Sequence, residues 1–139
     1  MVSTAYTRWT FENKKWAHLS DYVRMHALYE CGGFYFDTDV ELVKSIEELR
    51  YQKGFWSMEE TGCANSGSGI GMVSRNELIG KILEEYRSIS YEDLEEGKKL
   101  SVNAERESSL LRQYGFKANN CYQIINDIAI QKLVEMFRL

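Results

Sequence analysis

Two aspartates, Asp37 and Asp39, follow directly after the apolar run 34–36. On a strand, side chains two residues apart point to the same side, so a strand that reaches these residues brings both carboxylates together. Paired carboxylates are hard oxygen ligands of the kind that Mg²⁺ and Mn²⁺ prefer. A divalent ion held there could bridge the two phosphates of a nucleotide diphosphate and neutralise charge as that group leaves.

A plainer interpretation of the same residues is that Asp37 starts a turn and Asp39 is exposed. Two other aspartate motifs are disfavoured. An aspartyl-phosphatase motif needs Thr or Val at position 41, where this chain has Glu41, which argues against a metal-dependent phosphohydrolase. An EF-hand loop counted from Asp37 needs Gly at its sixth position, which is Leu42 here.

A second pair of residues able to do chemistry is Asp21 and Arg24, which lie three apart and share one face of a helix. A surface ion pair of little energetic value is the alternative. Because Gly32 and Gly33 separate this helix from the following strand, the two elements must run back on each other. We therefore expect this pair to approach Asp37 and Asp39 only if the helix packs obliquely beside the strand.

Helical spacing of apolar residues predicts a helix over about 14–31, which ends at the two glycines. The aromatic run 34–36 is typical of a strand buried on both faces, and 54–58 predicts a second strand. Segment 45–49 predicts a helical turn with Ser45 as N-cap and Glu48 completing a capping box. Segment 64–71, rich in glycine and serine, predicts a loop or an irregular strand.

Further along the chain, Asn76 is a predicted N-cap for a helix that runs to about Ser88. We expect an exposed charged segment over 91–99, a helix over 105–114 ended by Gly115, a strand over 122–125, and helical spacing over 128–139. Strands that alternate with helices predict one α/β domain over residues 1–139.

The bulk composition restricts the function. The formal net charge is −4 and no basic tract is present, so no nucleic-acid partner is expected. The three cysteines are widely spaced, which favours reduced thiols in a cytoplasmic protein. No apolar run is long enough for a membrane span, although peripheral contact with the inner membrane face is compatible with the sequence.

The ordered runs 15–24, 28–29 and 32–40 strongly resemble the DXD-containing sugar transferases. This family includes capsular polysaccharide transferases, yeast-type mannosyltransferases and the glucosyltransferase domains of large clostridial toxins. The resemblance implies a GT-A-like nucleotide-sugar transferase core, with a Rossmann-like mixed sheet and flanking helices. It also implies a retaining glycosyltransferase of polysaccharide biosynthesis. Such an enzyme moves a hexose from a UDP- or GDP-sugar to a saccharide or lipid-linked acceptor with Mn²⁺ or Mg²⁺.

The resemblance also implies roles for individual residues. Asp39 corresponds to the direct metal ligand, and Asp37 to the residue that bridges ribose, sugar and metal-bound water. Asp21 and Arg24 correspond to contacts with the donor sugar. Ala17 and Ser20 correspond to part of the nucleotide pocket, and Tyr35 corresponds to a residue that lines the donor site. Asn65 and Ser66 are similar to the acceptor side of the capsular branch, although a plain glycine-rich turn is equally compatible. No catalytic base is assigned.

The resemblance covers about residues 6–130, and the expected family segments on both sides are missing. We therefore expect an incomplete core that is truncated at both ends. A catalytically inactive remnant that serves as a nucleotide-sugar-binding or assembly module is the alternative function. A homo-oligomer could cover the missing segments. The remaining candidates, His18, His26, Glu59 and Glu60, are interpreted as partly exposed helix histidines and a solvated loop.

Overall fold

The computed structural model describes residues 3–97, 103–132 and 137–138. The helices are α1 (Ala5–Glu12), α2 (Trp16–Cys31), α3 (Glu77–Ser88), α4 (Tyr91–Glu95) and α5 (Asn103–Gln113), with the 3₁₀ turns η1 (Glu47–Tyr51) and η2 (Ser66–Ser68). The strands are β1 (Gly33–Tyr35), β2 (Glu41–Leu42), β3 (Gly54–Ser57), β4 (Ile70–Met72), β5 (Gln123–Ile125), β6 (Ile128–Gln131) and β7 (Phe137–Arg138). This mixture confirms the predicted α/β class.

The main sheet has the strand order β1-β4-β3-β6-β5, and β2 pairs separately with β7. Only β3 and β6 run parallel in the main sheet, with Trp56 opposite Ile130, and the other neighbours are antiparallel. The sheet is therefore mixed, as the resemblance implied. β1, which leads into the two aspartates, pairs with β4 and forms one edge of this sheet.

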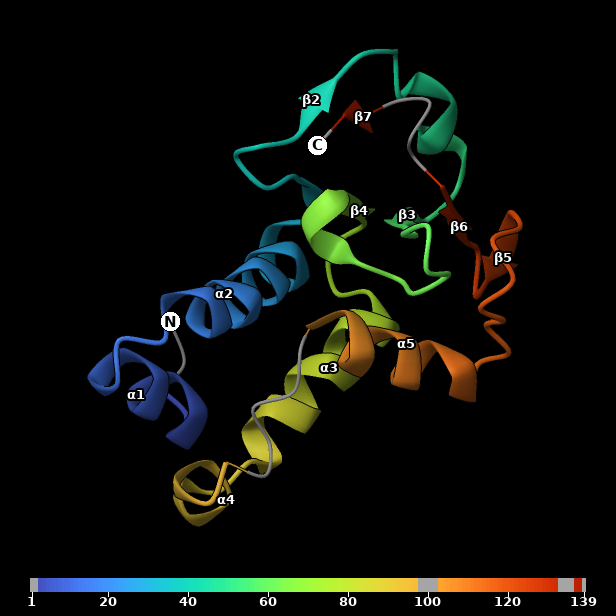
Figure 1. Cartoon of the computed structure of the whole chain (residues 1–139). Helices are drawn as coiled ribbons and strands as arrows, with labels where there is room; N and C mark the ends of the chain where they lie inside the picture. The colour runs from blue at the N-terminus through green and yellow to red at the C-terminus, as the bar shows by residue number, and fades with distance from the viewer. Residues whose placement is uncertain (1–2, 98–102, 133–136, 139) are drawn as a thin grey trace.

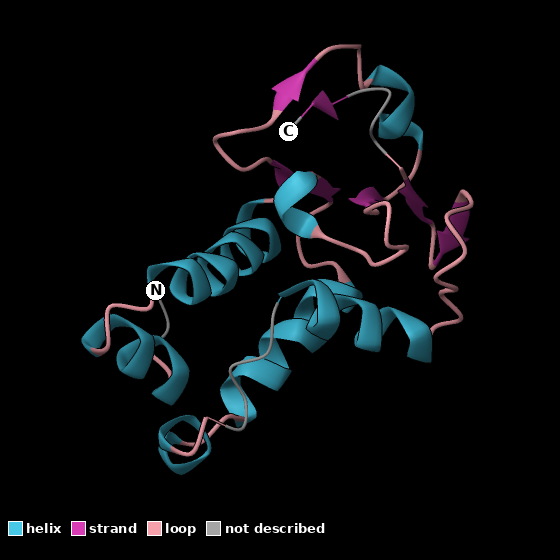
Figure 2. Ribbon diagram, in the orientation of Figure 1, coloured by secondary structure: helices cyan, strands magenta, loops and turns pink. Residues whose placement is uncertain are grey.

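The two faces of the sheet are packed differently (Figures 1 and 2), with the helices α1–α5 gathered on one side and β2, β7 and η1 on the other. Alternate strand residues such as Trp56, Ile70 and Ile130 join the helices in the main core. The opposite face carries a small cluster built from Leu49, Phe55 and Ala129. The helical face therefore supplies most of the buried apolar surface and fixes the strands from that side.

Several predicted elements are confirmed. α2 ends one residue before Gly32, whose φ of 67° is costly for any residue with a Cβ atom. α3 begins after Asn76, whose side chain accepts a hydrogen bond from the Leu78 amide at 2.9 Å. The predicted helix that ends before Gly115 and the strands at 54–57 and 123–125 are also present.

Three local predictions are wrong, and a fourth holds only in part. Segment 128–139 does not continue a helix, because residues 128–131 form β6 against β3, although residues 133–136 lie outside the described part. Phe34 is 51% exposed, since β1 is an edge strand and is not buried on both faces. Ser45 forms no capping box, because the 3₁₀ turn η1 starts after Ile46. The charged segment 91–97 is not wholly exposed, because Leu94 of α4 is buried.

Candidate functional site

A pocket of about 350 Å³ opens between the N-terminal half of α2, the loop after β1 and the start of α5. Residues from widely separated parts of the chain line it: Ala17, His18, Asp21, Arg24, Asp37, Glu59, Asn65, Asn103 and Ala104. Most of the residues that the resemblance placed around a donor therefore meet at one cavity. Most of its lining residues carry polar side chains, namely carboxylates, amides, an imidazole and one guanidinium, which can bind hydroxyl or phosphate oxygens.

Arg24 is the centre of this site. Its side chain is only 5% exposed, and its Nη2 lies 3.2 Å from Asp21 Oδ1 and 3.1 Å from Asp37 Oδ1. Its Nη1 donates to the Ser66 hydroxyl at 3.0 Å. Helix α2 thus packs beside β1 in the way required for the two predicted pairs to meet. One guanidinium joins the helix pair, the aspartate motif and the loop before β4.

Tyr35, the last residue of β1, contacts both Asp37 and Arg24. Its hydroxyl donates to Asp37 Oδ1 at 2.7 Å, and the Arg24 guanidinium carbon lies 4.6 Å from the centre of its ring. Burial and this hydrogen bond to Asp37 raise the pKa of Tyr35 above its usual value, so the phenol remains a donor. Tyr35 therefore positions Asp37 and Arg24 rather than lining the cavity itself.

The aspartate motif does not lie on a strand, so the prediction that strand alternation aligns its carboxylates is wrong. β1 ends at Tyr35, and the Val40 amide donates to the Asp37 carbonyl at 3.1 Å, which closes a turn. Aspartate is common at the first position of such turns. Asp37 is half-buried and held by Arg24, whereas Asp39 is exposed at the turn. The plainer turn interpretation is correct for the backbone.

Gly67 fixes the other side of Asp37. Its carbonyl accepts a hydrogen bond from the Asp37 amide at 3.0 Å. A Cβ atom at this glycine would lie 2.5 Å from Asp37 Oδ2, far inside van der Waals contact. The glycine-rich segment is thus more than a plain turn, because it lets the chain pass directly against the motif.

A buried polar network lies beneath the pocket and was not found by sequence reasoning. Glu107 is completely buried and accepts hydrogen bonds from the Trp56 indole at 2.8 Å, the Ser66 amide at 2.8 Å and the Ser66 hydroxyl. Asn103 Nδ2 also donates to the Ser66 hydroxyl, at 3.0 Å. The spacing of Glu107 with Leu110 and Leu111, three and four residues on, was the available signal, because it places the carboxylate on the buried face of α5.

Two carboxyl groups near Arg24 have raised pKa values. Burial raises the pKa of Asp21 to about 6, although the positive charge of Arg24 lowers it. Burial likewise raises the pKa of Glu107 to about 7, opposed by its hydrogen bonds from Ser66 and Trp56. Perturbed carboxyl groups around a cavity are common at functional sites.

The other predicted residues lie less centrally. Ser66 is buried behind the cavity rather than on its wall, and Ser20 is exposed with its hydroxyl donated to the Ala17 carbonyl at 2.7 Å. Two residues interpreted as surface features line the pocket. Glu59 accepts a hydrogen bond from the Asn65 amide and is half-buried, so a solvated loop is wrong for it. His18 is half-buried, and burial lowers its pKa.

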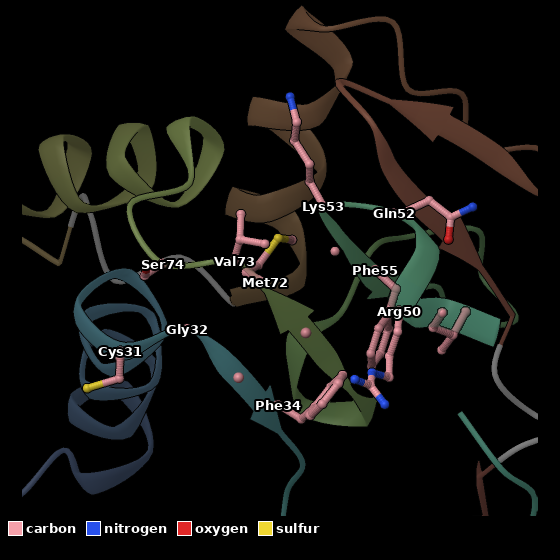
Figure 3. A pocket seen from close by; sticks show the side chains of 14 residues that line it. Cys31, Gly32, Phe34, Arg50, Gln52, Lys53, Phe55, Met72, Val73 and Ser74 are labelled. Atoms are coloured by element: carbon pink, nitrogen blue, oxygen red, sulfur yellow. The ribbon is translucent and has the colours of Figure 1, made fainter. Parts of the chain in front are cut away.

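A second cavity of about 400 Å³ lies over the other face of β1, β4 and β3 (Figure 3). Its lining is mainly apolar, and the rings of Phe34 and Phe55 stack with centres 5.9 Å apart. A Cβ atom at Gly71 would lie 2.6 Å from each ring, so glycine is needed between them. This cavity contains none of the residues that the sequence indicated for chemistry.

The carboxylate oxygens of the aspartate motif are of the type that divalent metals such as Mg²⁺ prefer. Asp37 uses Oδ1 for Arg24 and Tyr35, and no described hydrogen bond reaches its Oδ2 or the carboxylate of Asp39. The described residues contain no group of three or more His, Cys, Asp or Glu side chains that could hold a metal. Two carboxylates are nevertheless what Mg²⁺ needs when substrate phosphates and water complete its shell.

Comparison with known proteins finds similarity to glycosyltransferases. Residues 1–56 match the family described as the glycosyltransferase sugar-binding region containing the DXD motif. The fold is similar to the solved structure titled PaToxG Glycosyltransferase, with 22% sequence identity and a TM-score of 0.59. The match covers 78% of this chain and 39% of that one. No curated protein matches the chain.

The described residues also contain no helix that is both long enough and apolar enough to cross a membrane.

Proposed function

Because the first 56 residues match the DXD-containing sugar-binding region of glycosyltransferases, we propose that the chain is a glycosyltransferase core that binds a nucleotide-diphosphate sugar in the pocket around Arg24. The observation that carries this proposal is the double contact of Arg24 with Asp21 and Asp37. These contacts join the two halves of the sequence motif at the wall of one cavity that is lined by several polar side chains.

Arg24 and Asp21 are suited to the donor sugar. A guanidinium donates to sugar hydroxyls or phosphate oxygens, and a carboxylate accepts from hydroxyls. Asn65, fixed by Glu59 and by the Gly67 amide at 2.9 Å, offers an amide on the acceptor side. Ala17 leaves the start of α2 open for the nucleotide.

Asp37 and Asp39 would hold Mn²⁺ or Mg²⁺ together with the donor diphosphate. When bound, such an ion neutralises the charge that develops on the leaving diphosphate. Arg24 and Tyr35 hold the Asp37 carboxylate in place through its other oxygen. Asp39 is exposed at the turn Asp37–Val40, which supports the proposal that an ion approaches it from solvent.

The finer parts of the proposal rest on the resemblance. They are transfer of a hexose from a UDP- or GDP-sugar with retention of configuration, to a saccharide or lipid-linked acceptor of polysaccharide biosynthesis in the cytoplasm. The match covers 39% of the solved relative's chain, so sugar transfer by this chain is part of the proposal. Association of the chain with a second copy of itself is proposed as well.

Donor binding by the chain tests the proposal. Calorimetric titration with UDP-glucose and with GDP-mannose, each with Mn²⁺, should detect binding of at least one donor. Asp39→Ala should weaken that binding by about tenfold or more, since a carboxylate–metal contact is lost. Glu41→Ala, which removes an exposed carboxylate two residues away, is the matched control and should bind like wild type.

Hydrolysis of the bound donor, followed by release of free sugar, separates the two candidate functions. Slow hydrolysis that depends on Asp39 supports a transferase. Binding without hydrolysis favours the nucleotide-sugar-binding module. If neither donor binds to wild type at concentrations well above about 1 mM, donor binding by this chain is ruled out.

A further inference from the structure

Arg24 reaches Asp21 and Asp37 through one nitrogen, Nη2, whereas its other terminal nitrogen, Nη1, has a single described partner, the Ser66 hydroxyl at 3.0 Å. The orientation of the planar guanidinium therefore depends on Ser66 as much as on the two aspartates. Ser66 is itself completely buried, so water cannot replace it.

The Ser66 hydroxyl uses its whole hydrogen-bonding capacity. A hydroxyl donates one hydrogen bond and accepts two. Arg24 Nη1 and Asn103 Nδ2 both donate to this oxygen at 3.0 Å. The single proton of Ser66 must therefore go to its remaining neighbour, Glu107 Oε1.

Every described partner of the Glu107 carboxyl group is a donor. The Trp56 indole and the Ser66 amide donate to Oε2, and the Ser66 hydroxyl donates to Oε1. An ionised carboxylate, which only accepts, satisfies all of them. An amide of the same shape would place an NH₂ group against at least one donor.

We propose that Glu107 is a positioning residue of the donor site, which acts through the Ser66 hydroxyl to hold the Arg24 guanidinium against Asp21 and Asp37. Glu107 touches no residue of the aspartate motif, so it is not a catalytic residue. It aligns the lone pairs of Ser66 toward Arg24, and when it is ionised, above its pKa of about 7, its negative charge favours a cation there. The inference rests on the proposed function for its meaning, because Arg24 is the proposed donor contact.

The test combines a ligand-free readout with donor binding. In protein labelled with ¹⁵N-arginine, the guanidinium signals of Arg24, assigned with Arg24→Lys, report how firmly the group is held. In Glu107→Gln these signals should merge, because the less firmly held guanidinium rotates faster and the rotation averages them. The same variant should weaken binding of UDP-glucose or GDP-mannose with Mn²⁺ by about tenfold.

Ser108→Ala is the matched control. Ser108 is buried on the same helix and accepts a hydrogen bond from the Ala64 amide at 2.9 Å, so the variant loosens the same helix-to-loop contact without touching Arg24 or Ser66. Its Arg24 signals and donor affinity should stay like those of wild type. Ser66→Ala should reproduce the effect of Glu107→Gln. The double variant should bind donor no more weakly than either single variant, because both substitutions interrupt the same chain of hydrogen bonds from Glu107 through Ser66 to Arg24.

Unchanged Arg24 signals in Glu107→Gln, or an equal disturbance in Ser108→Ala, would overturn the proposal and leave Glu107 with a general packing role. Fully additive effects of Glu107→Gln and Ser66→Ala would also overturn it. If wild type binds neither donor while Arg24 responds to Glu107→Gln but not to Ser108→Ala, the positioning role stands and the proposed function fails.

Discussion

At the scale of single residues, the site is governed by how buried charges are compensated. Arg24 is nearly inaccessible to water, and it is surrounded by Asp21, Asp37 and, through Ser66, Glu107. A buried cation without such partners would be costly. The two aspartates of the motif therefore differ: Asp37 helps to compensate the charge of Arg24, whereas Asp39 is exposed.

Glu107 should make stability depend on pH. Its pKa is about 7 in the folded protein against an ordinary value of 4.5, so between these values the unfolded chain is ionised while the folded chain keeps its proton. Stability therefore falls as pH rises from about 4.5 to about 7 and does not fall further above that. The loss should amount to roughly 3 kcal/mol.

Urea unfolding of wild type and Glu107→Gln at several pH values checks this expectation. Asp21, whose pKa is about 6, also titrates in this range, but it is present in both proteins and cancels in their difference. The free energy of unfolding of wild type relative to the Gln variant should decrease across the window. A difference that stays flat, or that increases, would show that Glu107 is ionised throughout.

Part of this site could be predicted from sequence because it is local in the chain. Asp21 and Arg24 are one helical turn apart, and two glycines fix their return toward Asp37. The contributions of Ser66 and Glu107 come from segments whose approach depends on tertiary packing. Helical spacing places Glu107 on the buried face of α5, but it does not identify the groups that meet it there.

At the scale of elements, the loop between β3 and β4 matters as much as the helix and strand of the motif. It brings Asn65, Ser66 and Gly67 against α2 and against the turn after β1. The prediction of a loop or irregular strand was right for its parts, η2 and β4. The sequence did not indicate the role of this loop, because glycine and short polar residues occur in surface turns of many kinds.

Gly67→Ala should therefore impair donor binding more than folding. The new methyl group would lie 2.5 Å from Asp37 Oδ2, and Asp37 cannot move freely because Arg24 and Tyr35 hold Oδ1. We expect donor affinity to fall by about tenfold and stability to fall by about 1–2 kcal/mol. Calorimetric titration and urea unfolding measure the two effects.

Ser68→Ala, in the same 3₁₀ turn, is the control for this substitution and should leave donor affinity near that of wild type. Normal donor binding by Gly67→Ala would mean that the carboxylate of Asp37 is free to shift, and that its contact with this loop does not shape the site.

At the scale of the whole molecule, the sheet depends on a strand that sequence reasoning assigned to a helix. Ile128 and Ile130 of β6 are both fully buried, and they alternate with Ala129, which faces the opposite side of the sheet. Three consecutive apolar residues fit a buried strand and a buried helix equally well, so periodicity could not decide. Pairing with β3 decided in favour of the strand.

Ile130→Ala should lower the free energy of unfolding by about 2–5 kcal/mol, because it opens a cavity beside Trp56 on the helical face of the sheet. Ile124→Ala, on the neighbouring strand, removes a side chain that is 54% exposed and should cost less than about 1 kcal/mol. Chemical denaturation of both variants makes the comparison. Equal losses would contradict the described register of β5 and β6.

The pairing of β1 with β4 has a consequence for how the site forms during synthesis. The segment that matches the family model, residues 1–56, contains Asp21, Arg24 and Asp37, but β1 has no strand partner until residues 70–72 have been made. Ser66 is also synthesised after that segment, and Glu107 is synthesised later still. On the ribosome, the recognisable motif should therefore emerge early with its arginine unsupported, and the donor site should become rigid only after α5 has docked.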